Sequence, residues 1–229
     1  MGAKPFYSMR KAQNIFSPVA SRVLRVLLIH PYKGWTIEGL SEEANVSLGY
    51  THAVVLSLID QGYVYRDDSY RVAVNNPVKL IQRWAAYHSY VSVNTFFRYH
   101  TFERNLEAFL SKMKEVDESE YALTVLSGAY LVAPYVRPTT IHFYIKQREK
   151  VRTWVESLDL RPVEMGGNVS MVLPYDEGVF YGAGKVSGLN VVSKVQLYVD
   201  LYNYPARGEE AAEALLRDLN MEWAQQRDS

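Results

Sequence analysis

The chain has 229 residues, of which 48% are hydrophobic and 13% aromatic, and this is enough for a packed core in one large or two small domains. It contains no cysteine, which excludes a disulfide framework and a thiolate metal site. No stretch approaches the roughly 18 apolar residues of a membrane span, and the amino terminus lacks a signal-peptide pattern. We therefore expect a cytoplasmic protein with no membrane partner.

The formal net charge is zero, but the charges are unevenly distributed along the chain. Residues 1–84 contain ten Lys and Arg and six Asp and Glu, whereas residues 85–229 contain fifteen and nineteen. A polyanion such as nucleic acid would be attracted to the first third and repelled by the rest.

The first predicted helix follows a polar, basic segment, residues 1–16, which forms either a loose arm or part of the packed domain. Ser17 as the cap and Pro18 at the first helical position predict where the helix begins, and Pro31 ends it. Arg22 and Arg25 lie opposite its apolar face. They are interpreted as either solvated surface residues or phosphate contacts.

The stretch 35–74 predicts two short helices, a tight turn and a hairpin. Thr36 and Ser47 are expected to cap the two helices, Asn45 and Val46 to form the turn between them, and Gly62 to end the second. The chain then predicts two short strands, 63–66 and 70–74, around an Asp-Asp-Ser turn. This order of elements is that of a winged helix-turn-helix, a common DNA-binding fold.

The second of these helices would pack through a stripe at helical spacing, leaving Ser47, Tyr50, His52, Ala53 and Ser57 on its outer face. It has no Lys or Arg between positions 47 and 61, which excludes bidentate reading of guanine from this helix. The 47–57 face is expected in the major groove, with positive charge supplied from elsewhere. The candidate DNA-binding residues are Arg22, Arg25, Lys33, Ser47, Tyr50, Thr51, His52, Arg66 and Arg71. A purely structural or protein-binding role is the alternative.

The predicted organisation is α+β in three parts: a winged helix-turn-helix domain over 1–76, a connecting helix over 77–92 that starts after Asn76, and a mixed α/β domain with a central sheet over 93–229. Strands are expected at 92–100, 121–126, 139–145 and 189–192, and a hairpin at 161–164 and 168–173. Helices are expected after Thr101, over 147–158, from a Ser193 capping box to about 202, and over 209–226. Residues 115–120 are expected to form an acidic surface loop.

Three blocks of the second half carry a family resemblance: YALTVLSGAYLVAPYVRPTTIHFYI, LRPVEMGGNVSMVLPYDEGVFYG and VVSKVQLYVDLYNYPARGEEAAEALLRDL. In this order they resemble the C-terminal domain of the AbiEi-like antitoxins of abortive-infection, type IV toxin-antitoxin systems, whose members also begin with a winged helix. The resemblance implies an antitoxin that represses its own operon by binding inverted repeats in double-stranded DNA upstream of it. It also implies a nucleotidyltransferase-like toxin that the antitoxin counteracts without needing a stable complex.

Catalysis is not expected. Ser127-Gly128 followed by Thr140-Ile141-His142 weakly resembles the layout of nucleotidyltransferases, but Thr140 and His142 stand where two carboxylates would hold Mg²⁺. We therefore expect at most a degenerate nucleotidyltransferase-like domain, with no cofactor. The five histidines lack the spacing of a metal site, and Asp176-Glu177 is interpreted as a turn with solvated carboxylates. The alternatives are a ligand-sensing winged-helix regulator and, less favoured, a nucleotidyltransferase-related enzyme.

Overall fold

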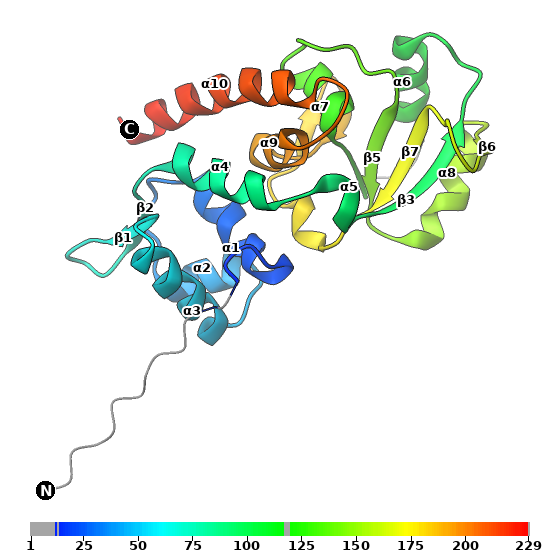
Figure 1. The fold of residues 1–229 in the computed structure, drawn as a ribbon. Coiled ribbons are helices and arrows are strands. Elements are labelled where there is room, and N and C mark those ends of the chain that lie inside the picture. Colours follow the sequence, from blue (N-terminus) through cyan, green and yellow to red (C-terminus); the bar gives the residue numbers. More distant parts are fainter. Residues whose placement is uncertain (1–11, 13, 117–119, 229) are drawn as a thin grey trace, which may run out of the picture.

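The computed structural model describes residues 12, 14–116 and 120–228. The basic residues 1–11 and the centre of the predicted acidic loop therefore lie outside the described residues. Within the described ranges the protein is a mixed α/β fold with a small N-terminal module and a large mixed sheet (Figure 1). We use "N-terminal module" for residues 14–76 and "C-terminal region" for residues 77–228.

The N-terminal module has three helices followed by a hairpin, as predicted. Its elements are α1 (Pro18–Ile29), α2 (Ile37–Glu43), α3 (Leu48–Asp60), β1 (Val64–Arg66) and β2 (Val72–Val74). The side chains of Ser17 and Thr36 accept the expected capping hydrogen bonds from Ala20 N and Gly39 N. Ser47 precedes α3 but its side chain makes no capping bond. Gly62 follows α3 with a φ of 72°, the left-handed conformation that glycine adopts without strain.

The C-terminal region begins with the predicted connection, which is two helices rather than one, α4 (Pro77–Tyr87) and α5 (Tyr90–Val93). The remaining strands are β3 (Thr95–His100), β4 (Tyr121–Leu123), β5 (Ile141–Ile145), β6 (Arg161–Pro162), β7 (Val169–Leu173), β8 (Gly184–Val186) and β9 (Leu189–Val191). The helices among and after them are α6 (Leu106–Glu115), α7 (Val125–Val132), α8 (Val151–Ser157), α9 (Lys194–Tyr202) and α10 (Gly208–Arg227), with the 3-10 turns η1 (Arg148–Lys150) and η2 (Glu177–Phe180).

Seven strands form one sheet in the order β6-β3-β7-β5-β4-β9-β8, in which β5 is parallel to β7, β4 is parallel to β9, and the other pairs are antiparallel. Alternate residues of β5 face opposite sides: Ile141 and Phe143 pack with α6 and α8, and Tyr144 packs with the cluster that includes α9. Helices therefore cover both faces of the sheet.

Two predicted elements of this region were wrong. The hairpin over 161–173 does not form, because β3 lies between β6 and β7 and pairs with both. The strand expected over 121–126 stops at Leu123, and α7 begins at Val125, which has a φ of 40°. The apolar run of α7 is buried and so has no clear helical period, which explains why it resembled a continuing strand.

The caps and turns of the region show two further differences. Asn105 caps α6 by accepting from Ala108 N, so the prediction that Thr101 is the cap was wrong. Asp176 is not solvated: its carboxylate is buried and accepts from Gly178 N at the start of η2. Ser193 does cap α9 as predicted, by accepting from Gln196 N.

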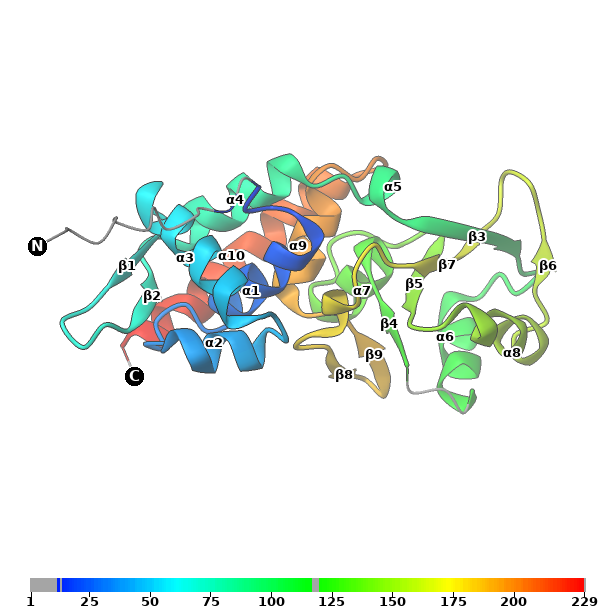
Figure 2. The same ribbon diagram turned by 90° about the horizontal axis from the view of Figure 1, so that it is seen from below.

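The N-terminal module and the sheet are joined through a shared core. Figures 1 and 2 both show α4, α9 and α10 between the β1–β2 hairpin and the sheet. The larger of the two buried apolar clusters includes Leu24 of α1, Leu58 of α3, Ala122 of β4 and Leu215 of α10. The orientation of the module relative to the sheet is thus fixed by side-chain packing. No helix in the described part of the chain is long and apolar enough to cross a bilayer.

Candidate nucleic-acid interface

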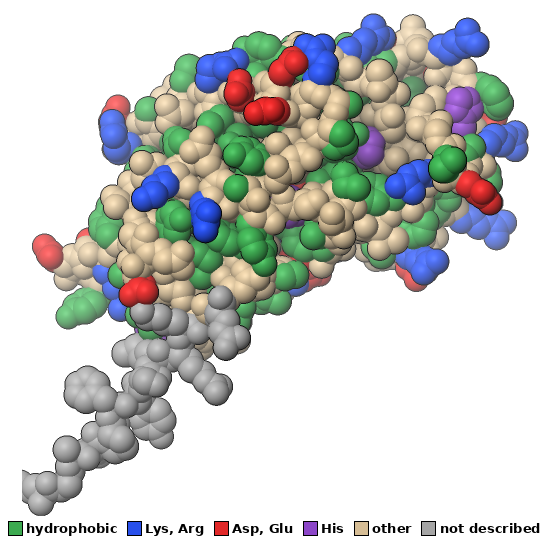
Figure 3. Space-filling view, viewed as in Figure 1, with side chains coloured by type: hydrophobic (Ala, Val, Ile, Leu, Met, Phe, Trp, Pro, Cys, Tyr) green, Lys and Arg blue, Asp and Glu red, His purple; other side chains and the backbone are tan. Residues whose placement is uncertain are grey.

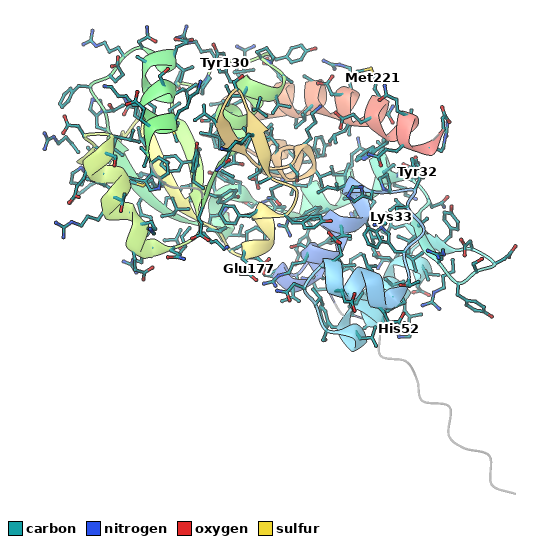
Figure 4. All side chains as sticks on the ribbon, turned by 180° about the vertical axis from the view of Figure 1, so that it is seen from behind. Tyr32, Lys33, His52, Tyr130, Glu177 and Met221 are labelled. Carbon is teal, nitrogen blue, oxygen red and sulfur yellow. The ribbon has the colours of Figure 1, made fainter. Side chains whose placement is uncertain are left out.

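The start of α3 and the β1–β2 hairpin enclose an open cavity of about 530 Å³ on the surface of the N-terminal module. It is lined by Thr36, Ile37, Glu38, Leu48, Gly49, His52, Arg66, Ser69 and Tyr70. Figure 4 labels His52 at the end of the molecule opposite the sheet. Of the nine residues predicted to bind DNA, His52 and Arg66 line this concave surface between a helix and a hairpin.

Arg66 and Arg71 lie on the hairpin, as predicted. Arg66 lines the cavity, and its Nε is buried without a hydrogen-bond partner among the described residues. Arg71 is exposed, and its Nη1 donates to the carbonyl oxygen of Gly34 at 3.0 Å. Asp67 stabilises the hairpin turn by accepting from the backbone N–H groups of Ser69 and Arg71 at 2.9 and 2.8 Å. The hairpin therefore carries two guanidinium groups, that of the half-buried Arg66 at the end of β1 and that of the exposed Arg71 after the turn.

The outer face of α3 is smaller than predicted. Ser47, Leu48 and Gly49 are exposed and His52 is half-buried. Tyr50 is half-buried, with its hydroxyl hydrogen-bonded to that of Ser17, 3.0 Å away. The part of α3 that could contact the major groove of DNA therefore consists mainly of Ser47, Leu48, Gly49 and His52.

Thr51 and Ser57 are removed from the candidate surface. Thr51 is 0% exposed and its hydroxyl lies inside the module, as expected for its place on the inward stripe of α3. Ser57 is also buried, and its hydroxyl donates to the carbonyl oxygens of Ala53 and Ala12.

Arg25 is another correction, because its side chain is fully buried and offers nothing to a phosphate. Its three nitrogens donate to Gln196 Oε1 at 2.6 Å, to Ser21 Oγ at 2.8 Å and to the hydroxyl of Tyr175 at 2.6 Å. The guanidinium also lies 5.1 Å from the ring centroid of Trp84. Arg25 therefore joins α1 to the C-terminal region.

Arg22 likewise serves an internal contact. Its Nε and Nη2 form a bidentate pair with the Asp176 carboxylate at 2.9 Å, and its Nη1 lies 3.2 Å from Glu177. The hydrogen bond with Asp176 raises the pKa of Arg22 above its ordinary value. Figure 4 shows Glu177 at the junction with the N-terminal module. A phosphate would have to displace two carboxylates to reach this guanidinium.

The positive charge of the described interface is therefore modest. Lys33 is exposed but its ammonium lies 3.8 Å from the ring centroid of Trp35, and Figure 4 shows it well away from His52. Three exposed carboxylates follow Lys33 in the chain, at Glu38, Glu42 and Glu43 of α2. The charge asymmetry of the sequence thus depends on Lys4, Arg10 and Lys11, which lie outside the described residues, and on two arginines that are occupied internally.

A buried polar network behind this interface was not anticipated from the sequence. Asp200 of α9 is fully buried and accepts four hydrogen bonds, from Thr124 Oγ1 at 2.6 Å, Tyr144 OH at 3.0 Å, Gln196 Nε2 at 2.7 Å and His88 Nε2 at 3.2 Å. Gln196 in turn accepts from Arg25, which extends the network to α1. One sequence signal was present, an aspartate on the apolar helix VQLYVDLY.

The segment that resembled a nucleotidyltransferase is also packed. Ser127 Oγ donates to Thr140 O at 3.2 Å and accepts from His142 N at 2.8 Å, which ties α7 to β5. The His142 ring is hydrogen-bonded to the hydroxyls of Tyr90 and Tyr204, and burial lowers its pKa to about 4. Among the residues that the structure describes, no group of three or more His, Cys, Asp or Glu could hold a metal ion.

A comparison with protein families gives a match over residues 73–221, more than half of the chain, to the model described as transcriptional regulator, AbiEi antitoxin, type IV toxin-antitoxin system. This range covers the end of the hairpin, the sheet and most of α10. Comparisons with curated proteins and with solved structures gave no match. The resemblance seen in the three sequence blocks is thereby confirmed, and the chain belongs to the AbiEi antitoxin family of transcriptional regulators of type IV toxin-antitoxin systems.

Proposed function

We propose that this chain is a DNA-binding antitoxin that represses its own type IV toxin-antitoxin operon. The observation that carries the proposal is the arrangement of α2, α3 and the β1–β2 hairpin around an open cavity, in a member of a transcriptional regulator family. This arrangement has the element order of a winged helix-turn-helix, with α3 as the recognition helix and the hairpin as the wing. Trp35 adds to the wing through a bridge with Val72.

In this proposal the start of α3 enters the major groove and the wing contacts the sugar-phosphate backbone. Ser47 and His52 offer hydrogen bonds to base edges and Leu48 offers an apolar contact. The half-buried Arg66, which lines the cavity, and the exposed Arg71, on the same hairpin, would supply positive charge to phosphates. So small a reading face favours two copies on inverted repeats, or recognition of DNA shape, over tight binding by one copy.

The C-terminal region acts in this scheme by interaction, without catalysis or a cofactor. The two positions at which a nucleotidyltransferase would need carboxylates are Thr140 and His142, and the latter is enclosed by Tyr90 and Tyr204. The partner implied by the family is a nucleotidyltransferase-like toxin, which the antitoxin counteracts without a stable complex. A protein that represses transcription in this way works in the cytoplasm, beside the chromosome.

The test is fluorescence anisotropy of the full chain on its own upstream DNA and on a scrambled duplex, at two salt concentrations. We expect a preference for the upstream DNA that persists at the higher salt, because base contacts do not depend on released counterions. Replacing both wing arginines, Arg66→Ala and Arg71→Ala, should reduce the slope of log affinity against log salt by about 1 to 2, since about one counterion is released per phosphate contact.

The control is Arg152→Ala, which removes an exposed arginine on α8 that pairs with Glu156, far from the wing. It should leave the salt slope unchanged. An unaltered slope in the double wing variant would refute the wing assignment. Equal binding of both duplexes that disappears with salt would refute sequence-specific repression by this module.

A further inference from the structure

A second cavity, of about 570 Å³, lies at the end of the molecule opposite the wing, between α6 and the start of β5. Figures 1 and 2 both show α6 far from the β1–β2 hairpin. The volume is within the range of small-molecule sites, roughly 300 to 1,000 Å³. It is lined by His100, Thr101, Phe102, Glu103, Arg104, Leu106, Phe109, Arg137, Pro138, Thr139, Ile141 and Asn168.

One wall of this distal cavity is held in place by a paired amide contact. Asn168 Oδ1 accepts from the backbone N of Thr101 at 2.8 Å, and Asn168 Nδ2 donates to the carbonyl oxygen of Thr101 at 3.0 Å. The apolar part of the lining belongs to the cluster of buried residues on that face of the sheet, including Phe109 and Ile141. Two of the stretches that line the cavity are therefore tied together before any ligand arrives.

The charges at the cavity favour an anion. Arg104 is exposed and its guanidinium has no ion pair within the described ranges. The one carboxylate in the lining, Glu103, is already satisfied, because it accepts from Asn105 N at 3.0 Å and pairs with Lys112 at 3.3 Å. Arg137 contributes a second guanidinium, whose pair with Glu107 is exposed on both sides and thus weak. Figure 3 shows Lys and Arg side chains outnumbering acids at the end of this face that carries α6 and α8.

An aromatic surface accompanies the two arginines. The Phe102 side chain is 75% exposed, an unusual degree for a phenylalanine, and its ring lies edge to face against His100 with centroids 5.1 Å apart. Such a ring offers a stacking surface to any flat aromatic ligand. Two guanidinium groups and an exposed ring at one cavity match a ligand with phosphate at one end and a base at the other.

We propose that the distal cavity binds a nucleotide, with Arg104 and Arg137 on the phosphates and Phe102 against the base. A metal cation does not fit, because the single carboxylate is already paired. A purely apolar ligand would leave Arg104 desolvated without a partner. The proposal adds a small-molecule site to the regulator and does not rest on DNA binding, because it is tested on the protein alone.

The experiment is isothermal titration calorimetry of the full chain, without DNA, with ATP, GTP, CTP and UTP in turn, and with adenosine and inorganic pyrophosphate as half-ligands. We expect at least one nucleotide to bind more tightly than either half-ligand. Arg104→Ala with Arg137→Ala should weaken that nucleotide by about tenfold or more, because charge-assisted bonds are lost. Phe102→Ala should weaken the nucleotide but leave pyrophosphate unchanged. These side chains are exposed, so the variants should fold normally.

Arg152→Ala is again the matched control, because it removes one exposed arginine from α8 outside the cavity lining. It should bind the nucleotide as the parent chain does. The proposal is overturned if no nucleotide binds at millimolar concentration, or if the double arginine variant binds as tightly as the parent. If pyrophosphate binds as tightly as every nucleotide, the base adds nothing to binding, and the proposed stacking of Phe102 on the base is wrong.

Discussion

A buried histidine makes the stability of this protein depend on pH. The ring of His142 is enclosed by Tyr90 and Tyr204, and burial lowers its pKa from 6.5 to about 4, with a smaller contribution from Arg98. The unfolded chain therefore binds more protons at this site than the folded one between these values, so stability falls as pH falls. Through this group alone, the protein should be about 2 kcal/mol less stable at pH 5 than at pH 7.5.

The measurement is the free energy of unfolding in urea at several pH values between 5 and 7.5, for the parent chain and for His142→Gln. Glutamine keeps hydrogen-bonding groups near the two tyrosines but does not titrate. The free energy of unfolding of this variant should therefore fall by about 2 kcal/mol less than that of the parent between pH 7.5 and pH 5. Gly49→Ala, which changes no titratable group and adds a Cβ that meets nothing within 4 Å, is the control and should keep the parent slope. Parallel curves for His142→Gln and the parent would contradict the prediction.

The four candidate arginines show that residue type alone does not predict which side chains are free to contact DNA. From the sequence, Arg22 and Arg25 were either solvated surface residues or phosphate contacts on α1, and Arg66 and Arg71 were candidate phosphate contacts on the hairpin. The partners that separate them are more than 140 residues away in the chain: Asp176 for Arg22, and Gln196 and Tyr175 for Arg25. Local periodicity contains no information on such contacts, and a buried charge is tolerated only where these partners converge.

At the scale of elements, α7 is placed by a close approach at Gly128. A Cβ added at this position would lie 2.9 Å from Leu197 Cδ1, 3.0 Å from the carbonyl oxygen of Leu123 and 3.1 Å from Val191 Cγ1. Gly128→Ala should therefore destabilise the protein by about 1 to 3 kcal/mol through overpacking, although alanine is the better helix former. Urea denaturation measures the change.

Gly49 provides the matched control, because it is also a helical glycine and a Cβ there would meet nothing within 4 Å. Gly49→Ala should be neutral or more stable by up to about 1 kcal/mol, as expected from helix propensity alone. Equal stabilities of the two alanine variants would show that α7 is free to move away from α9 and β9.

The elements that the sequence predicted well are those with local signals. Ser17 with Pro18, Thr36, Gly62 and Ser193 each mark a boundary by a capping bond or a backbone conformation that depends on neighbours in the chain, and each boundary lies where it was expected. The failed elements depend on distant contacts. The pairing of β6 with β3 brings Tyr99 next to Pro162, and the helix α7 forms in an apolar run whose burial hides its period.

The same reasoning applies to the candidate interface. The order of helix, turn, helix and hairpin was predictable, and so was the place of Arg66 and Arg71 on the hairpin. The burial of Thr51 could be predicted from its place on the inward stripe of α3. Ser57 and Tyr50 are instead covered by contacts from Ala12 and Ser17, which lie before α1. The distal cavity had no local signature, because its lining comes from three separated stretches of chain.

At the scale of the whole molecule, α10 connects the N-terminal module to the C-terminal region. Trp223, near the end of α10, is 2% exposed and donates from Nε1 to the carbonyl oxygen of Leu28 at 2.8 Å. The core cluster that contains it extends from α3 to the sheet. Since no boundary in this cluster separates the two parts, we expect them to unfold as one cooperative unit.

Trp223→Ala should therefore reduce the free energy of unfolding by about 3 to 5 kcal/mol, as for other deletions of large buried side chains. The informative measurement is hydrogen exchange resolved by peptide. The backbone amides of α3 and β5 should lose protection by the same free energy, although the indole hydrogen bond of Trp223 is made to Leu28 of the module. The control is Met221→Ala, at an exposed position of α10 (Figure 4). It should change neither the free energy of unfolding nor the protection of the two elements. Loss of protection in α3 alone would mean that the module moves independently of the sheet. Equal loss in both would mean that the N-terminal module and the C-terminal region unfold as one unit, without a flexible hinge between them.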